Sequence, residues 1–253
     1  MRTKFDLNIL LEKPVLLWEK FHEKTKIKKR FKDIPIKSWP ESWKTIYLKS
    51  YPRFTEIILP KPNLSNKISF KKVLSSRISS RKFGNIPLDI KQLSNLLYHS
   101  AGLKDKLSPH SGRFYPSAGG RYPLEVYVLS LNTDLPRGLY HYYLKNHSLE
   151  ELMLIDKFDL KKILLPKKWI NNTACIIIIT AVFERNTIKY GERGYRHVLT
   201  ESGLLLQNFY LNASSLNINC CAYGGYLDDH INQLLDIDGI NESVVNVLLI
   251  GNP

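Results

Sequence analysis

The chain has 253 residues, of which 43% are hydrophobic and 24% charged, the composition of a globular protein large enough to bury a core. It has no run of about 18 apolar residues, which excludes a transmembrane helix, and three cysteines, two of them adjacent, offer neither a disulfide framework nor a metal-ligand spacing. The net charge of +14 is concentrated at the N-terminus, where the first 70 residues carry 16 Lys and Arg against 7 Asp and Glu. No nucleic-acid-binding motif accompanies this charge, so a solvated basic face or an acidic partner is favoured over nucleic acid.

Residues 1–70 differ from the rest of the chain. They are rich in Lys, Trp and Pro, and their first residues make a poor signal peptide because acidic residues interrupt the apolar stretch. Because the three cysteines offer no disulfide framework either, a reducing cytoplasm is the simplest location. We expect a short helix over 13–24 and then an extended arm that wraps around a larger domain formed by residues 71–253.

From residue 69 onward the hydrophobic pattern becomes regular. It predicts helices over 91–102 and 200–217 and strands over 124–131, 138–152 (as a hairpin), 175–183 and 244–251. Thr200 is expected to cap the second helix, and Asp228 and Asp229 to cap a further short one. Strands separated by helices indicate an α+β fold with a mixed central sheet flanked by helices.

A first candidate site lies in the segment SSRISSRKFGN (75–85). Arg77, Ser79 and Arg81 alternate, so an extended backbone would point all three side chains the same way. Two guanidinium groups and a hydroxyl that converge on one spot suit a phosphate. Scattered surface residues are the competing explanation.

A second candidate is the small-residue turn at 116–120, which runs directly into the strand predicted over 124–131. Residues without bulky side chains let backbone N–H groups approach an anion or a flat ligand closely. The turn is neither a Walker loop nor a dinucleotide fingerprint, and a plain structural turn is the alternative. Gly224 and Gly225 form a second glycine pair after an apolar stretch.

A third candidate is the pair Lys189 and Tyr190, placed just after the predicted buried strand, where active-site groups often gather. A lysine beside a tyrosine can lower the pKa of the phenol, which would make a base for removing a carbon-bound proton. His110, His147 and His230 share no metal-ligand spacing and are expected to be hydrogen-bonded histidines of loops or of the surface.

In their order along the chain, these segments resemble the SagB-type dehydrogenases, the thiazole- and oxazole-forming branch of the nitroreductase superfamily. The resemblance rests on FHEKTK (21–26), IILPKP (57–62), Arg77-x-Ser79-x-Arg81, PSAGGRYPLEVYV (116–128), KYGERGYRHVLTESG (189–203) and VVNVLLIGNP (244–253). It implies a nitroreductase-like fold and an FMN-dependent oxidation of thiazolines or oxazolines in a precursor peptide. It also implies a homodimer and a complex with cyclodehydratase subunits.

The resemblance also assigns residues to roles. Tyr190 would be the base and Lys189 its electrostatic support, or the reverse. The cofactor-binding residues would be Arg77, Ser79, Arg81, Pro116, Ser117, Ala118, Gly119, Gly120, Arg196, Gly224 and Gly225. The turn at 116–120 would come from the second subunit. Many nitroreductases use a basic residue beyond the last strand for the phosphate; here the sequence ends at Pro253, which places more of that role on the Arg77 cluster.

Two other functions remain open. The chain could be a flavin reductase that acts on small molecules with NAD(P)H, because such enzymes need no nicotinamide motif. It could also be a non-catalytic assembly subunit of a synthetase complex.

Overall fold

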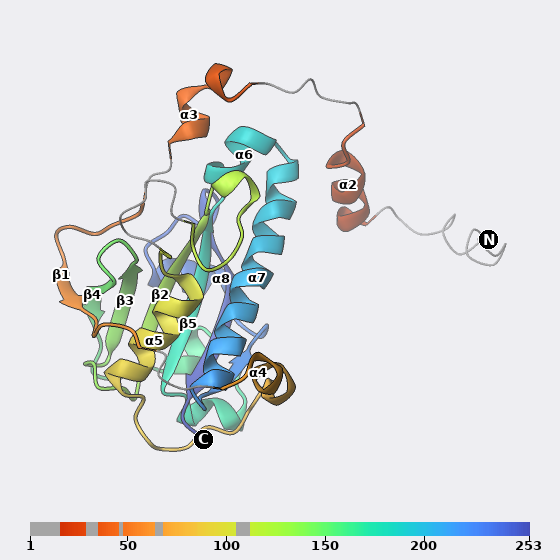
Figure 1. Ribbon diagram of the computed structural model, residues 1–253. Helices are drawn as coiled ribbons and strands as arrows, with labels where there is room; N and C mark the ends of the chain where they lie inside the picture. The colour runs from red at the N-terminus through yellow and green to blue at the C-terminus, as the bar shows by residue number, and fades with distance from the viewer. Residues whose placement is uncertain (1–15, 29–34, 46–47, 64–67, 105–111) are drawn as a thin grey trace.

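The computed structural model describes residues 16–28, 35–45, 48–63, 68–104 and 112–253, and its centre is one seven-stranded sheet (Figure 1). The strand order is β1-β4-β3-β2-β5-β7-β6. The strands are β1 (Thr55–Ile58), β2 (Leu124–Ser130), β3 (Gly138–Tyr143), β4 (Ser148–Leu154), β5 (Cys175–Val182), β6 (Asn219–Ala222) and β7 (Glu242–Gly251). The α-helices are α2 (Leu17–Lys24), α3 (Glu41–Lys44), α4 (Phe70–Ser76), α5 (Ile90–Ala101), α6 (Glu184–Tyr190), α7 (Arg193–Ser215) and α8 (Asp228–Leu234). Single 3-10 turns span Ile36–Ser38, Ala118–Gly120, Leu160–Lys162 and Lys168–Asn172.

The α+β class is confirmed, but the expected mixture of strand directions is wrong. Each neighbouring pair of these seven strands is antiparallel. The units β5, α7 and β6 do form a crossover between strands that run in the same direction. The last strand, β7, inserts between β5 and β6 in the opposite direction, so the two never become neighbours.

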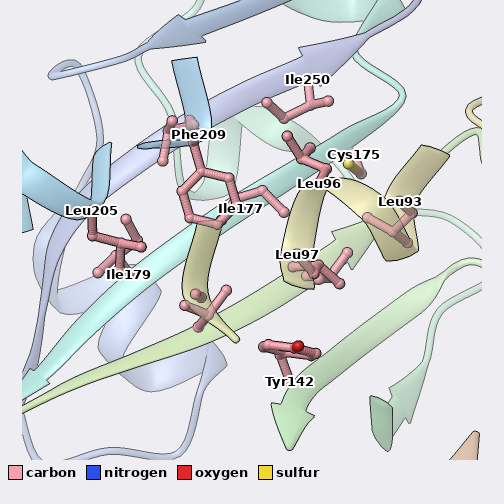
Figure 2. Close-up of a cluster of buried hydrophobic side chains, with 14 of the residues drawn as sticks. Leu93, Leu96, Leu97, Tyr142, Cys175, Ile177, Ile179, Leu205, Phe209 and Ile250 are labelled. Atoms are coloured by element: carbon pink, nitrogen blue, oxygen red, sulfur yellow. The ribbon is translucent and has the colours of Figure 1, made fainter. Parts of the chain in front are cut away.

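The hydrophobic core has two layers, one on each face of the sheet. On one face, α5 and α7 pack over the centre, where Leu97 and Phe209 meet Ile177 of β5 (Figure 2). On the other face, α8 and the 3-10 turns at Leu160–Lys162 and Lys168–Asn172 cover side chains such as Ile176 and Ile178. Because consecutive residues of β5 point to opposite faces and both faces are covered, the strand reads as an unbroken apolar run, as expected.

The predicted helices and strands are largely confirmed, with three corrections at helix starts. The long helix α7 starts at Arg193 rather than after Thr200, whose hydroxyl donates to the carbonyl of Arg196 one turn earlier instead of capping. A separate helix, α6, follows β5 directly. The N-cap of α8 is Leu227, so Asp228 and Asp229 lie in its first turn instead of capping it.

The helix expected over 13–24 is seen as α2, and residues 13–15 lie outside the described part of the chain. None of the described helices is both long and apolar enough to cross a lipid bilayer. The arm that follows α2 passes α6 and then supplies the edge strand β1, which pairs with β4 (Figure 1).

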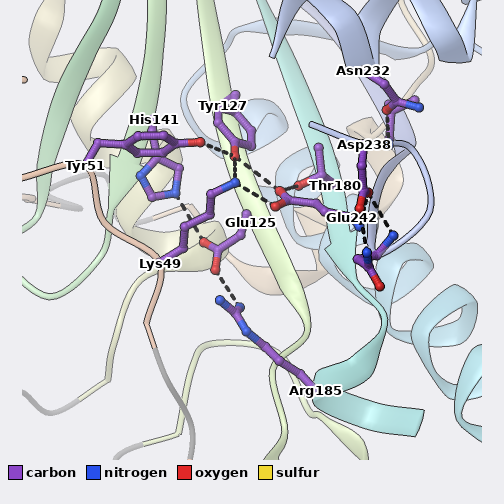
Figure 3. A network of polar contacts seen from close by, with 12 residues as sticks. Lys49, Tyr51, Glu125, Tyr127, His141, Thr180, Arg185, Asn232, Asp238 and Glu242 are labelled. Carbon is purple, nitrogen blue, oxygen red and sulfur yellow. Dashed lines mark hydrogen bonds and ion pairs between the residues drawn. The ribbon is translucent and has the colours of Figure 1, made fainter. Parts of the chain in front are cut away.

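A buried polar network holds this arm on the sheet (Figure 3). Lys49 Nζ donates to Glu242 Oε2 at 2.6 Å and to Tyr127 Oη at 2.8 Å. Thr180 Oγ1 donates to the other oxygen of Glu242 at 2.6 Å. Burial lowers the pKa of Lys49, but the interactions with Glu242 and Tyr51 together outweigh it, so the pKa is raised and the ammonium is retained.

Candidate active site

Lys189 and Tyr190 lie in the last turn of α6, at its junction with α7. They were expected directly after a strand; instead α6 intervenes, and Gly191, with φ of 54°, then turns the chain into α7. The ring of Tyr190 meets the ring of His197 edge-on, with centroids 5.1 Å apart. The pair is therefore held between two helices rather than on a loop.

The small-residue turn packs directly against this pair. Gly119 has φ of +63°, and a Cβ atom there would overlap Tyr190 Oη and lie 3.2 Å from Lys189 Nζ. The position thus needs glycine for its backbone conformation and for the close approach of both side chains. The structure brings together two segments that the sequence singled out independently.

A buried carboxyl fastens the same turn to α7. Ser117 Oγ donates to Glu201 Oε2 at 2.6 Å and accepts from the backbone N–H of Tyr122 at 2.8 Å. Burial raises the pKa of Glu201 to about 7, against the bond from Ser117 and the charge of Arg113, which lower it. Glu201 was missed by the sequence analysis, although a glutamate within the apolar stretch 198–206 was a visible signal.

Arg121 is buried beside the pair and joins three segments. Its guanidinium donates to the carbonyls of Arg185 at 2.6 Å, Trp43 at 2.7 Å and Ser42 at 3.1 Å. All three acceptors are neutral, so its positive charge reaches the neighbouring side chains uncompensated.

These surroundings shift the pKa values of both Lys189 and Tyr190, and the direction for Tyr190 is opposite to the one expected from sequence. Burial raises the pKa of Tyr190, and the opposing charge of Arg121 does not overcome it. Burial, with Arg121 again contributing, lowers the pKa of Lys189. The prediction that Lys189 would lower the pKa of Tyr190 is therefore wrong, because desolvation of the phenol dominates.

Lys189 and Tyr190 open into a cavity of about 770 Å³. One wall is formed by the start of α7, and the other by the arm, whose contribution the sequence did not predict. The lining residues are Lys24, Thr25, Lys26, Ile27, Lys28, Trp39, Trp43, Lys189, Tyr190, Gly191, Glu192, Arg193 and His197. The arm thus does more than wrap the domain: it forms one wall of the candidate site.

The Arg77 segment lies at the opposite end of α7. Arg77 Cζ is 5.5 Å from the ring centre of Tyr210, and Ser79 Oγ is 3.0 Å from Tyr210 Oη. Arg81 instead stacks over Trp169 at 5.9 Å, on the other face of the sheet. The shared direction expected from alternation therefore holds for Arg77 and Ser79 but not for Arg81, because the segment is not a strand.

This end of the molecule can receive an anion. Arg77 and Arg81 take part in none of the ion pairs formed among the described residues. Arg77 and Arg81 lie over different faces of the sheet, so they do not converge on one spot as the sequence predicted. Each guanidinium group can still offer charge-assisted donors to a phosphate. The described part of the chain has no cluster of three or more His, Cys, Asp or Glu side chains that could hold a metal ion.

The glycine pair lies with Arg81 and not with Lys189. Gly225 accepts from the backbone N–H of Leu165 at 2.7 Å, and the adjacent Tyr223 stacks edge-on against Trp169, with ring centroids 5.5 Å apart. A side chain at Gly224 would meet open space.

Arg196 lies apart from Arg77. It donates to the carbonyl of His22 and stacks over Phe21 at 5.8 Å, so it holds α2 against α7. Along α7, thirteen residues separate His197 from Tyr210, or about 20 Å at 1.5 Å per residue. Within one chain the Arg77 cluster and the Lys189–Tyr190 pair are therefore not neighbours.

Comparison with known proteins identifies the family of this chain. The nitroreductase family model matches residues 74–252. A protein of Methanocaldococcus jannaschii named as a nitroreductase is 33% identical over 175 residues, which cover 68% of this chain and 86% of that protein.

Two further relatives are peptide-processing proteins. The microcin B17-processing protein McbC of Escherichia coli is 28% identical over 158 residues, or 60% of this chain and 57% of McbC. The trifolitoxin-processing protein TfxB of Rhizobium leguminosarum is 26% identical over 178 residues, or 65% of this chain and 47% of TfxB. The chain thus matches about half the length of each processing protein.

Solved structures agree on the fold. A nitroreductase of Ralstonia eutropha superposes with a TM-score of 0.67 at 25% identity, over 78% of this chain and 89% of that one. A chain of the E. coli microcin synthetase McbBCD complex superposes with a TM-score of 0.64 over 98% of this chain and 97% of that one; at 21% identity this is a likeness of fold. The match of the family model over 74–252 and the relative at 33% identity lead to one conclusion: the chain belongs to the nitroreductase family.

Proposed function

We propose that the protein is an FMN-dependent dehydrogenase that oxidises thiazolines or oxazolines to thiazoles or oxazoles during maturation of a ribosomally made peptide. The observation that carries the proposal is the convergence of Lys189 and Tyr190 on the turn at Gly119, at the floor of a large cavity. Removal of a carbon-bound proton needs a base positioned within reach of that proton. One member of the pair would be this base, and the other would support it or orient the substrate.

The names of two relatives support a peptide substrate. McbC and TfxB are named for the processing of microcin B17 and trifolitoxin. The microcin synthetase structure, whose fold this chain shares, is a complex that includes truncated pro-MccB17, and it is in keeping with a synthetase complex for this chain. Cyclodehydratase subunits would be the partners that the resemblance implies. A cytoplasmic location fits the three unpaired, buried cysteines.

The residues present fit FMN. Arg77 and Ser79 would hold the phosphate, with Arg81, Arg196, Gly224 and Gly225 as further predicted contacts. The turn from Pro116 through Ser117, Ala118 and Gly119 to Gly120 would lie against the flat ring. When bound, FMN supplies the hydride acceptor that the oxidation requires.

The pKa directions favour Lys189 as the proton acceptor, the reverse of the first assignment from sequence. The lowered pKa of Lys189 makes its neutral amine more accessible, whereas the raised pKa of Tyr190 keeps its hydroxyl protonated. Tyr190 Oη would then donate a hydrogen bond to the substrate ring and orient it beside Lys189.

The same geometry supports a homodimer with two shared sites. The Arg77 cluster and the Lys189–Tyr190 pair lie at opposite ends of α7, so each complete site would draw one end from each subunit. The exposed face of α7 carries Leu199, Gly203 and Leu204, and a side chain at Gly203 would meet open space. Such a face suits close packing against a second copy.

The test is product analysis with a purified azoline-containing peptide. The protein should release FMN on denaturation, and each ring should lose two hydrogen atoms. Lys189→Ala should lower the rate of oxidation at least about 100-fold, the low end of general-base catalysis, and Tyr190→Phe should lower it clearly, with FMN retained in both. Full oxidation by both variants with FMN bound would refute the assignment, and a colourless protein would refute the cofactor.

A small-molecule flavin reductase is the second candidate, supported by the relative from M. jannaschii, which is named as a nitroreductase. That enzyme would consume NAD(P)H with a nitroaromatic substrate, and the azoline peptide would remain unchanged.

The partner is tested through the basic run at 24–32. Lys24, Lys26 and Lys28 are exposed at the cavity mouth, whereas Lys29 and Arg30 lie outside the described residues. Reversing the charges of Lys28, Lys29 and Arg30 should weaken binding of the cyclodehydratase or of an acidic leader peptide. Reversal of the exposed Lys71 and Lys72 on α4 is the matched control.

A further inference from the structure

The wall of the cavity above Lys189 comes from the arm, outside residues 74–252 that the family model matches. Its aromatic members are Trp39 and Trp43, which meet edge-on with ring centroids 6.1 Å apart. Trp39 lies just before α3 and Trp43 lies within it, and Figure 1 places α3 beside α6. At this point the arm therefore adds two indole rings to the domain that the family model matches.

Hydrogen bonds fix this wall to the catalytic helix. Trp43 Nε1 donates to the carbonyl of Ile188 at 3.1 Å, one residue before Lys189. Arg121 donates to the carbonyls of Ser42 and Trp43 and also to the carbonyl of Arg185 in α6. The arm and α6 thus share one buried guanidinium, which holds the indole rings at a set position relative to Lys189.

The ammonium of Lys189 sits on the face of Trp39. Its Nζ is 3.6 Å from the Trp39 ring centre, and the rings of Tyr190 and Trp43 follow at 5.5 Å and 5.8 Å. Tryptophan is the strongest cation–π acceptor, and this separation is well inside the range of such contacts. Lys189 takes part in none of the ion pairs formed among the described residues. The aromatic face therefore takes the place that a carboxylate would otherwise hold.

We propose that Trp39 is a positioning residue, which holds Lys189 Nζ at the Gly119 turn beside Tyr190 Oη and stabilises the ammonium that forms when Lys189 accepts the substrate proton. This inference rests on the proposed function only for the proton-transfer step; the placement of Lys189 by Trp39 does not depend on it. In consequence the arm contributes a residue, Trp39, to the proposed active site.

The experiment compares Trp39→Phe, which keeps an aromatic face, with Trp39→Leu, which removes it. Trp18→Leu, an exposed tryptophan of α2 outside the cavity, controls for the loss of one indole. Reductive methylation of the full-length protein, read at each lysine by peptide mass spectrometry, measures access to Lys189 without any peptide substrate. Lys49, half-buried and paired with Glu242, serves as the internal reference lysine.

Trp39→Leu should raise the methylation rate of Lys189 about 3- to 10-fold, the loss of a partly exposed cation–π contact, and leave Lys49 and the Trp18→Leu protein unchanged. With an azoline peptide, it should lower kcat by a similar factor with little change in KM and with FMN retained. Trp39→Phe should restore most of both properties. Trp39→Met, which keeps apolar bulk without a ring, replaces the leucine variant if that variant does not fold.

Unchanged methylation of Lys189 in Trp39→Leu would overturn the proposal, and so would equal effects of phenylalanine and leucine, which would indicate packing alone. A different result would overturn the proposed function: Lys189→Ala would leave azoline oxidation intact. That result does not depend on how fast Lys189 is methylated in the Trp39 variants.

Discussion

At the scale of single residues, the candidate site depends on how closely a backbone turn approaches two side chains. Gly119 and Gly120 share left-handed backbone angles, with φ of +63° and +64°, yet only Gly119 faces Tyr190 and Lys189. Substitutions at the two glycines therefore separate the cost of the left-handed backbone from the cost of displacing the side chains that face Gly119.

Alanine at either glycine should cost about 1–2 kcal/mol of unfolding free energy from the left-handed backbone alone. Only Gly119→Ala should also push Tyr190 Oη away, because the end of that side chain yields before the backbone does. Urea unfolding measures the shared cost, and nuclear Overhauser contacts between the rings of Tyr190 and His197 report the displacement. If both variants keep those contacts, the close approach at Gly119 is not needed to place Tyr190.

The raised pKa of Glu201 predicts how the stability of the protein depends on pH. Its pKa is raised from 4.5 to about 7 in the folded protein, so between these pH values the folded state holds a proton that the unfolded state has released. The free energy of unfolding therefore falls as pH rises through this window, by up to about 3 kcal/mol at 1.36 kcal/mol per pKa unit.

Glu201→Gln should remove this dependence, because the amide stays neutral. Its stability relative to the natural protein should rise between pH 4.5 and pH 8, as measured by urea unfolding at several pH values. The exposed Glu184→Gln variant controls for the substitution itself. Parallel curves for Glu201→Gln and the natural protein would mean that the carboxyl is already ionised at pH 5.

At the scale of elements, the helix that carries Lys189 and the arm that covers it are each held by buried polar contacts. Glu125 lies between them: its carboxylate bonds to Arg185 of α6 at 2.5 Å and to His141 of β3 at 3.3 Å (Figure 3). Burial raises the pKa of Glu125, but His141 and Arg185 outweigh it and lower the pKa to about 2. The sheet thus holds α6 through a charged chain of contacts, and the arm through Lys49.

Lys49→Met should release the arm from the sheet. Glu242 would keep its bonds from Thr180 and Tyr127 but lose its counter-charge, at an expected cost of about 2 kcal/mol for a largely buried pair. Hydrogen exchange should accelerate across residues 48–58. The exposed pair of Lys44 and Glu41, 3.6 Å apart, offers the matched control, because Lys44→Met should change stability by less than about 1 kcal/mol. Equal effects of the two methionine variants would contradict the role of Lys49 as an anchor.

At the scale of the whole molecule, the two ends of the candidate site are about 20 Å apart along α7 in one chain. In a homodimer with shared sites, Arg77 of one subunit would serve the Tyr190 of its partner. That arrangement is open to a complementation test.

Arg77→Glu and Tyr190→Phe should each lower the oxidation of an azoline peptide when present in both subunits. In a hybrid dimer with one change in each subunit, one site would hold both defects and the other would hold neither. About half of the natural activity should therefore return in purified hybrids with two different affinity tags. Activity that stays at the level of the single variants would place Arg77 and Tyr190 of the same chain in one site.

The sequence by itself determined the α+β class, the extents of most core elements and two segments, 116–120 and 189–190, that meet in the candidate site. Periodic apolar runs such as 175–183 and small-residue turns such as 116–120 are local patterns, and local patterns report local structure and chemistry. Only the tertiary structure decided the antiparallel insertion of β7, the raised pKa of Tyr190, the separation of Arg77 from Lys189 and the indole face of Trp39 over Lys189. Each of these depends on which distant segments meet and on how much water they exclude, and neither is encoded in the spacing of residues along the chain.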